Sequence, residues 1–317
     1  MQGGNAADAA AAAAAALNVT EPTSTGLGGD CFALYYEART QAVTGLNGSG
    51  RAPAALTIDL IRKQGLATVN DEIRDPFHAH CVTVPGACAG WCDLVERHGS
   101  LPLAAILAPA IRLAEEGFPV APLTSYFWGR GAQRQLKGRG EELTIEGRGP
   151  RAGEMFRNPG LARTFRAVAE GGKDAYYRGE IARRMVETIQ ANGGAMTMDD
   201  LAAHTSTWDT PISTTYRGLR VWECPPNGQG LTALIALNIL EGFDLAALDP
   251  LSPEHLHLII ESLRLAFADA RWYVADPAFN PAPLEGLLSK SYAAERRRLE
   301  HDHGAAQRPD RRGPLGS

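Results

Sequence analysis

Three glycines lie close together at residues 25–30, TGLGGD, and glycine-rich turns of this kind can bind phosphate. A phosphate site needs the glycines to follow a strand and open a helix, so that the phosphate meets the amides of the helix N-terminus. Here the order is reversed, because a predicted helix precedes the glycines and a predicted strand follows them. We therefore predict that Gly26, Gly28 and Gly29 permit a tight turn, with a pocket-lining loop as the alternative.

Two pairs of histidines could offer imidazole ligands to a metal: His78 with His80, and His301 with His303. Alternate residues share one face of a strand, so the first pair could converge. Neither pair has a third ligand nearby. We interpret these residues as surface or capping histidines and predict no metal and no cofactor.

The five cysteines, at positions 31, 81, 88, 92 and 224, are scattered and odd in number, which argues against a disulfide framework. Cys88 and Cys92 would share one helix face, but no other soft ligand stands at zinc-site spacing. We predict reduced thiols that pack in the core. No Gly-x-Ser-x-Gly elbow and no cysteine-protease signature supplies a nucleophile.

Composition excludes several classes of protein. The 317 residues are 44% hydrophobic and carry a formal net charge of -5, without a basic stripe, which argues against nucleic-acid binding. No apolar run approaches the roughly 18 residues that a membrane-spanning helix needs. No signal peptide follows Met1, so a cytoplasmic location is expected, or a periplasmic or secreted one if a leader precedes this sequence.

The elements that must position any site are predicted from periodicity and caps. Asn5 with Asp8 has the form of a capping box and predicts a helix that ends before Pro22. Strands are expected over residues 31–37 and 42–48, and a third strand over HCVTVP at residues 80–85.

Amphipathic helices dominate the rest of the chain. Thr197 with Asp200 predicts a short capped helix, and Ser252 caps the longest one. Residues 130–151 are predicted to be a surface excursion, and TYRGLRVWECPP at residues 215–226 a single strand stopped by two prolines. The pattern favours an α+β fold with a helix-covered sheet.

Six stretches of the chain resemble, in order, the large subunit of the gamma-glutamyltranspeptidase family. They lie at residues 3–36, 82–103, 107–120, 193–208, 216–230 and 261–279. The first begins GGNAAD and continues through the GLGGD turn into a strand, as the family does. Because the resemblance covers nearly the whole chain, it is far more specific than one glycine motif.

The resemblance implies an N-terminal-nucleophile hydrolase with an αββα four-layer sandwich, of which residues 1–317 would be the large-subunit region. Such an enzyme is made as one precursor that cuts itself before a threonine, occasionally a serine. The hydroxyl of that residue attacks the amide and its own α-amine acts as the base. Backbone amides stabilise the oxyanion. The implied partners are a small subunit from the same precursor and a small-molecule amide.

The catalytic nucleophile is then expected after Ser317, so no catalytic residue is assigned within this chain. A strand that begins the family's large subunit is expected before Met1. The chain alone is expected to be inactive. Residues 296–317 lose their apolar periodicity and are predicted to form a mobile tail.

Two substrate-binding residues are implied by the resemblance. In gamma-glutamyl enzymes an Arg-Glu-x-Ala-Pro segment supplies an arginine for the substrate carboxylate. The matching segment here is Ser49–Pro53, so Ser49 stands where that arginine would, and Arg51 lies two positions later. If the segment is extended, the two residues share a face and Arg51 could reach the same pocket. The other interpretation of Arg51 is a solvated loop cation.

This departure leaves three functions open. The leading one is a gamma-glutamyltransferase or glutathione hydrolase-like enzyme that cleaves or transfers an acyl group. The alternative within catalysis is an acylase or amidohydrolase of the same superfamily, acting on a cephalosporin-type or oxamate-type amide. A non-catalytic fragment is the third.

Overall fold

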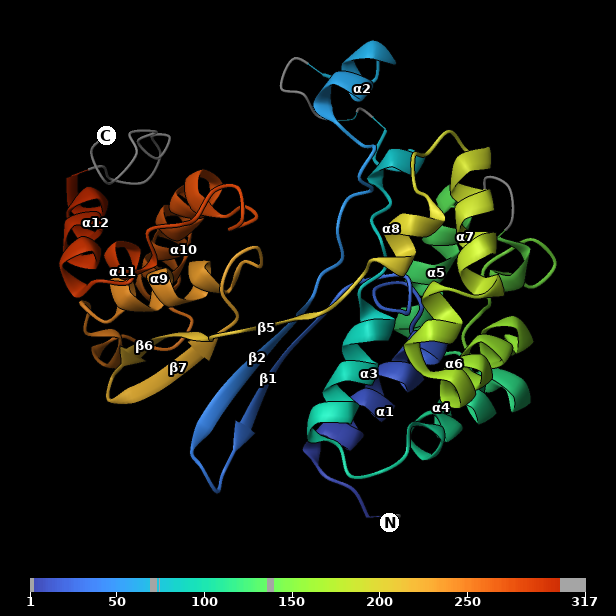
Figure 1. Cartoon of the computed structure of the whole chain (residues 1–317). Coiled ribbons are helices and arrows are strands. Elements are labelled where there is room, and N and C mark those ends of the chain that lie inside the picture. The colour runs from blue at the N-terminus through green and yellow to red at the C-terminus, as the bar shows by residue number, and fades with distance from the viewer. Residues whose placement is uncertain (1–2, 69–72, 74, 136–139, 303–317) are drawn as a thin grey trace. The chain divides into compact units, whose positions relative to one another are not determined.

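The computed structural model of the chain describes residues 3–68, 73, 75–135 and 140–302 (Figure 1). It divides into two compact units, Met1–Phe32 with Asn47–Thr207, and Ala33–Leu46 with Trp208–Ser317. Helices and strands are mixed in the described chain, which confirms the predicted α+β class. Among the described residues, no helix combines the length and apolar character needed to cross a bilayer.

The first unit is mainly helical. Its helices are α1 (Ala6–Thr20), α2 (Ile58–Lys63), α3 (Ala87–His98), α4 (Leu103–Glu116), α5 (Pro122–Gln135), α6 (Pro159–Tyr177), α7 (Glu180–Ala191) and α8 (Met198–Ala202). Two short strands, β3 (Phe118–Pro119) and β4 (Met155–Phe156), pair antiparallel. Helix α4 packs against both α1 and α6, so these helices enclose the core.

The second unit combines a hairpin with helices. Its elements are β6 (Ile212–Tyr216), β7 (Leu219–Glu223), α9 (Gly230–Leu240), α10 (Pro253–Tyr273), α11 (Leu284–Leu287) and α12 (Lys290–Asp302). Strands β1 (Cys31–Glu37), β2 (Ala42–Gly48) and β5 (Thr207–Asp209) form a three-stranded sheet in the order β1-β2-β5. The bounds of β1 and β2 match the predicted strands.

The N-terminus of α1 is fixed by the predicted capping box. The Asn5 side chain accepts hydrogen bonds from the amides of the first helical turn, and Asp8 accepts one from the Asn5 amide at 2.8 Å. Asp8 is only 3% exposed and also accepts from the amide and hydroxyl of Ser100 and from the amide of Leu101. Burial opposes its charge, but these hydrogen bonds outweigh burial and lower the pKa of Asp8. One carboxylate thus joins α1 to the loop between α3 and α4.

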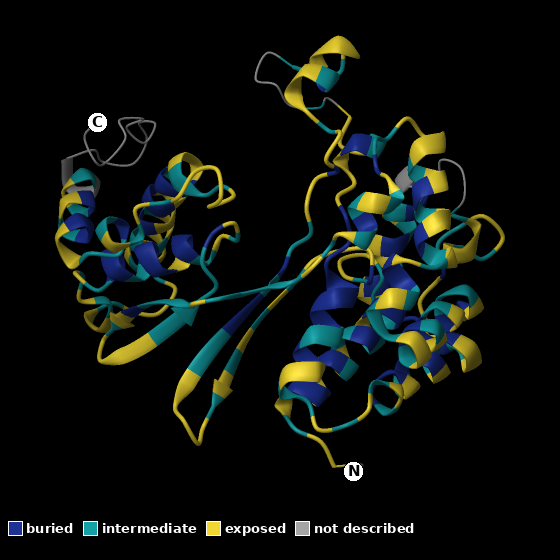
Figure 2. Cartoon of the chain, in the orientation of Figure 1, coloured by how far each residue is buried: buried dark blue, intermediate teal, exposed yellow. Residues whose placement is uncertain are grey.

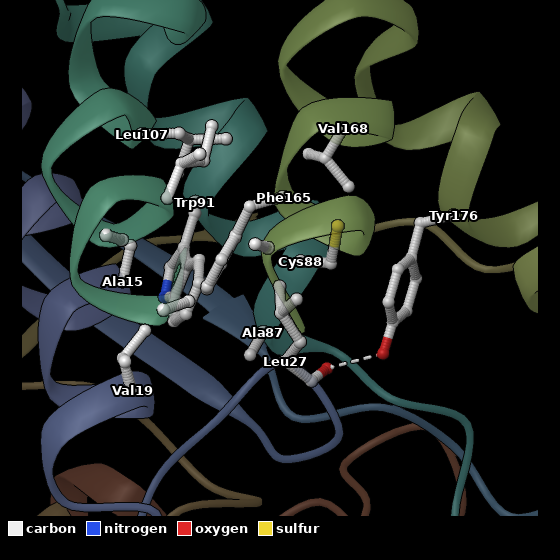
Figure 3. Packing of buried hydrophobic residues seen from close by; sticks show 14 of the residues in the cluster. Ala15, Val19, Leu27, Ala87, Cys88, Trp91, Leu107, Phe165, Val168 and Tyr176 are labelled. Carbon is white, nitrogen blue, oxygen red and sulfur yellow. Dashed lines mark hydrogen bonds between the residues drawn. The ribbon is translucent and has the colours of Figure 1, made fainter. Parts of the chain in front are cut away.

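The core of the first unit forms where the small side chains of α1 meet α3, α4 and α6. Ala15 and Val19 of α1 are buried beside Trp91 of α3 and Phe165 of α6 (Figure 3). The small alanine side chains of α1 let the neighbouring helices approach closely. Figure 2 shows this buried face along α1 and α3, with exposed residues on the outer turns.

A buried ion pair joins two helices of the second unit. Asp269 of α10 is 1% exposed and Arg296 of α12 is 6% exposed. The two are hydrogen-bonded, with the Arg296 Nε donating to Asp269 Oδ2 at 3.2 Å, and the Tyr292 hydroxyl donates to the same carboxylate at 2.8 Å. Burial raises the pKa of Asp269, while the charge of Arg296 and the Tyr292 hydroxyl oppose that rise. The carboxylate therefore depends on these two partners to stay ionised.

The predicted third strand is wrong. A 3-10 turn, Ala79–Cys81, occupies the start of residues 80–85 in place of a strand. The cause is a side-chain cap, because the His78 imidazole accepts a hydrogen bond from the His80 amide at 3.1 Å. Because the backbone turns at this point to accommodate the His78 cap, it is not extended and cannot pair with a neighbouring strand there.

Three other boundaries differ from prediction. Residues 212–223 form the hairpin β6–β7, not one strand, because Arg217 and Gly218 both have positive φ and make the turn. Helix α5 continues to Gln135, inside the predicted surface excursion. Helix α12 includes residues 296–302 of the predicted tail. Residues 303–317 and 136–139 lie outside the described residues.

Candidate functional site

The glycine turn at residues 26–29 makes hydrogen bonds with other backbone groups of the chain and does not form a phosphate site. The Gly29 amide donates to the Gly26 carbonyl at 3.0 Å, which closes the tight turn that was predicted. The Gly29 carbonyl accepts hydrogen bonds from the amides of Gly86 and Ala87, at 2.8 and 3.0 Å, at the start of α3. The amides of Gly86 and Ala87 at the start of this helix therefore already have a backbone partner.

The same turn also lines a hollow of about 490 Å³, so both interpretations of the glycines are correct. Its walls include residues 22–30, Trp128 and Phe156. The Trp128 indole nitrogen donates to the Leu143 carbonyl at 2.8 Å and its ring meets Phe156 edge-on, with centroids 4.6 Å apart. The hollow is therefore lined by a fixed aromatic pair as well as by the glycine turn.

The segment at residues 48–53, which runs from the last residue of β2 into the loop before α2, carries the two predicted site residues. Backbone contacts fix it on both sides: the Val84 amide donates to the Arg51 carbonyl at 2.9 Å, and the Ala54 amide donates to Asp200 of α8 at 2.8 Å. Asp200 is also the capping residue predicted for α8. This segment is thus held in place by residues about 30 and 150 positions away in sequence.

Gly48 and Gly50 allow a very close backbone approach at this point. A Cβ on Gly86 would overlap the Gly48 carbonyl oxygen and lie 2.8 Å from the Gly50 nitrogen. A Cβ on Gly50 would overlap the Val84 carbonyl oxygen, and Gly50 has φ +78. Only glycine fits this approach, so the glycines of the 48–53 segment set the path of the chain toward Arg51.

The structure does not support the alternation argument for Ser49 and Arg51. The argument required an extended segment, and the left-handed conformation of Gly50 between them breaks the period of two. The Ser49 hydroxyl donates to the Gly50 carbonyl at 3.3 Å, and the Arg51 side chain is exposed. The two residues are two positions apart in the chain and do not share a strand face.

His204, which follows α8, lies within the electrostatic reach of Arg51. Burial lowers the pKa of His204 most, and the charges of Arg51 and Lys173 lower it further against the opposing effect of Asp93. Its ring lies 5.1 Å from that of Tyr177. Sequence reasoning missed this neighbour, because no local pattern links positions 51 and 204. The site therefore combines an exposed guanidinium, which suits an anionic group, with a partly buried imidazole whose pKa is lowered.

The histidines that were considered as metal ligands have different structural roles. His78 is a capping histidine, as predicted, whereas His80 is buried and pairs with Gln64 at 2.7 Å. His301 is helical and His303 lies outside the described residues.

All five cysteines are free, but only Cys88 is fully buried, and Cys81 is exposed in contrast to the predicted core location. The described residues hold no group of three ligands suited to a metal.

Comparison with known proteins agrees with the family resemblance of the sequence. The gamma-glutamyltranspeptidase family profile matches residues 1–314. A glutathione hydrolase-like YwrD proenzyme of Bacillus subtilis is 37% identical, over 100% of this chain and 59% of that protein. The chain therefore spans little more than half the length of this curated relative.

Two solved structures match the fold. A cephalosporin acylase from Bacillus halodurans has a TM-score of 0.86 at 44% identity, over 93% of this chain and 55% of that chain. A gamma-glutamyltranspeptidase from Pseudomonas nitroreducens has a TM-score of 0.87 at 28% identity, over 99% and 93%. The matches confirm the predicted fold class of N-terminal-nucleophile hydrolases.

Proposed function

The chain belongs to the gamma-glutamyltranspeptidase family, and from that membership we propose that it is the large-subunit region of an amide-cleaving or acyl-transferring enzyme. The observation that carries the proposal is the family match over residues 1–314, together with relatives that are proenzymes about twice as long. The nucleophile is a threonine or serine hydroxyl at the start of a second segment of the same precursor. Its α-amine removes the hydroxyl proton as the hydroxyl attacks the amide carbon.

The part of this chain in that reaction is to bind the acyl group. Arg51 is exposed on a segment whose backbone is held by hydrogen bonds to Val84 and Asp200, so the point from which its side chain extends is fixed. A guanidinium binds a carboxylate through two parallel hydrogen bonds, which orients as well as attracts it. Burial and the positive charge of Arg51 lower the pKa of His204, which favours the neutral form of this neighbouring imidazole.

An exposed apolar stripe on α10 supports the proposal that a further polypeptide packs against the second unit. Leu256, Ile260, Leu263 and Phe267 follow one another at spacings of four, three and four and are 37–53% exposed. Residues at these spacings lie on one helix face. Contiguous apolar surface of this kind marks an interaction site, and the second segment of the precursor is the occupant that the proposal supplies.

Purification from the native source tests the proposal directly. We expect a second chain to accompany this one, with threonine or serine as its first residue in N-terminal sequencing. Replacement of that residue by alanine is expected to leave the precursor uncut. Recovery of this chain without any such companion would overturn the proposed enzyme.

In the complete enzyme, Arg51→Ala is expected to raise KM about tenfold for an amide whose acyl group carries a carboxylate. The reason is the loss of a charge-assisted contact of about 1.4 kcal/mol, made equally in substrate and transition state, so kcat changes little. Initial-rate kinetics with such an amide and with an uncharged analogue provide the measurement.

The matched control is Arg62→Ala, an exposed arginine of α2 whose guanidinium lies 3.7 Å from the Asp59 carboxylate. It is expected to leave KM within about twofold of the parent value. Equal KM values for the parent and Arg51→Ala would remove Arg51 from the binding site.

The acylase alternative rests on a specific observation. Ser49 occupies the position of the arginine in the gamma-glutamyl segment, and the cephalosporin acylase is 44% identical to this chain. A substrate panel with gamma-glutamyl amides, cephalosporin-type amides and small dicarboxylic amides separates the two functions. Higher kcat/KM for the gamma-glutamyl amides would favour the transferase function, and the reverse order would favour the acylase.

A further inference from the structure

The hollow of about 490 Å³ beside the glycine turn contains two asparagine side chains that the proposed reaction does not use. Asn18 belongs to α1, Asn158 caps the N-terminus of α6, and each is only 8% exposed. A carboxamide has an acceptor oxygen and an NH₂ group that donates, and buried polar groups of both kinds need partners. The partners of these two side chains therefore indicate what the hollow can bind.

The oxygen of each carboxamide already has a backbone partner. Asn18 Oδ1 accepts a hydrogen bond from the Leu27 amide at 3.2 Å, and Asn158 Oδ1 accepts one from the Leu161 amide at 2.9 Å. Because only the oxygen can accept from an amide, these bonds also identify the nitrogen end of each side chain. No described residue accepts a hydrogen bond from Nδ2 of Asn18 or Asn158. Two NH₂ groups are therefore left to donate.

Both NH₂ groups are held in place before any ligand arrives. A Cβ on Gly26 would lie 2.6 Å from Asn18 Nδ2, so this nitrogen lies against the turn that lines the hollow. The backbone amide of Asn158 donates to the Ala114 carbonyl at 2.8 Å, while its side chain caps α6. A ligand that accepts from these nitrogens does not have to order them first, which lowers the cost of binding.

Several carbonyl oxygens of the lining residues already accept hydrogen bonds from within the chain. The Leu27 carbonyl accepts from the Tyr176 hydroxyl at 3.0 Å (Figure 3). The Leu143 carbonyl accepts from the Trp128 indole nitrogen at 2.8 Å, and the Gly29 carbonyl accepts from two amides at the start of α3. The hollow therefore has unused donors while these acceptors are engaged, so a matching ligand supplies acceptor oxygens.

The charge of the lining residues narrows the class of ligand further. Among the described residues that line the hollow, Asp30 is the only charged one. A carboxylate ligand would lose hydration there without a countercharge, which is costly. Val19, Trp128 and Phe156 contribute apolar surface, and the exposed residues 23–25 contribute hydroxyls that water can reach. The volume lies within the range of about 300–1,000 Å³ that is usual for small-molecule sites.

We propose that this hollow binds a small uncharged molecule with an apolar ring and a carbonyl oxygen, of the tertiary amide or lactam class. The carbonyl oxygen accepts hydrogen bonds from the NH₂ groups of Asn18 and Asn158, and the ring packs on the apolar lining. No residue of the 48–53 segment lines the hollow. The site is therefore separate from Arg51, and its test does not depend on the proposed reaction.

The test is a titration of the full chain, labelled with ¹⁵N-asparagine, with N,N-dimethylbenzamide at pH 7. The side-chain NH₂ signals of Asn18 and Asn158 are assigned by their loss in Asn18→Asp and Asn158→Asp. We expect both signals to shift and to saturate with a Kd on the order of 1 mM, as suits a ligand of this size. The signal of Asn192, an exposed residue at the end of α7, is expected to stay in place.

Two further probes that contain the same phenyl ring test the class of ligand. Benzoate has acceptor oxygens but carries a negative charge, and N,N-dimethylbenzylamine is a cation without a carbonyl. We expect each to bind at least about fivefold more weakly than the neutral amide. The reason for benzoate is the unpaired charge, and the reason for the amine is that the two NH₂ groups find no acceptor.

Substitutions of the capping asparagine test its NH₂ group without removing the cap. Serine and aspartate are also good N-cap residues, so Asn158→Ser and Asn158→Asp are expected to keep α6 and the melting temperature. Asn158→Ser loses the donor and is expected to raise Kd at least about fivefold. Asn158→Asp also places an acceptor against the ligand oxygen and is expected to raise Kd at least about tenfold. Asn192→Asp, the matched control, is expected to leave Kd within about twofold.

Three results would overturn the proposal. The first is the absence of any saturable shift at Asn18 and Asn158, which would mean that the hollow holds only water. The second is an unchanged Kd in a folded Asn158→Ser or Asn158→Asp chain, which would remove this NH₂ group from the site. The third is tighter binding of benzoate or of the benzylamine than of the neutral amide, which would overturn the assigned class of ligand.

Discussion

Gly86→Ala is expected to lower the free energy of unfolding of the first unit by at least about 3 kcal/mol. The new methyl group would overlap the Gly48 carbonyl oxygen and crowd the nitrogen of Gly50. Both neighbours are backbone atoms, so no side-chain rotation relieves the overlap. The 48–53 segment must move, and Arg51 moves with it. Urea unfolding provides the measurement.

Gly28→Ala is the matched control, since it changes a glycine of the neighbouring turn where a Cβ would meet nothing within 4 Å. We expect its free energy of unfolding to stay within about 0.5 kcal/mol of the parent value. If Gly86→Ala were as stable as Gly28→Ala, the close approach between residues 48–50 and 84–86 would be wrong.

Arg296→Met is expected to destabilise the second unit by about 3–5 kcal/mol. The substitution leaves Asp269 buried with only the Tyr292 hydroxyl as a partner, and burial already raises the pKa of this carboxyl. The pair Asp269→Leu/Arg296→Met removes both charges and is expected to lose less stability than the single substitution, because no unpaired charge remains. Urea unfolding of the parent and both variants measures the difference.

An exposed ion pair of α10 provides the control. Arg264 and Glu261 are 2.7 Å apart with 41% and 23% exposed side chains. Arg264→Met is expected to cost no more than about 1 kcal/mol, since solvent screens the pair. A loss below 1 kcal/mol for Arg296→Met as well would show that Asp269 finds another partner.

Local signals in the sequence predicted the parts of the fold that depend on local contacts. The capping boxes at Asn5–Asp8 and Thr197–Asp200 involve residues three positions apart, and both form as predicted. The bounds of β1 and β2 match the two strands that were predicted on either side of a turn. The strand predicted at residues 80–85 failed because the same kind of local contact, a His78 side-chain cap, competed with extension.

The candidate site depends on contacts that no local pattern encodes. The sequence, read with the family resemblance, pointed to the 48–53 segment and to Arg51. It could not reveal that Asp200 anchors this segment, or that His204 lies near Arg51, because these pairs are about 150 residues apart. The left-handed Gly50 likewise follows from close packing against Val84, a tertiary effect.

The hydrogen bonds of Asp8 have a consequence for the order of events during synthesis. This carboxylate joins the first helix to Ser100 and Leu101, more than ninety residues later. Chains leave the ribosome from the N-terminus, so α1 emerges long before its partners and exposes its alanine face meanwhile. The contact that Asp8 makes is therefore a late, long-range closure, and a ribosome stalled before residue 100 would hold α1 without either hydrogen-bond partner from the loop between α3 and α4.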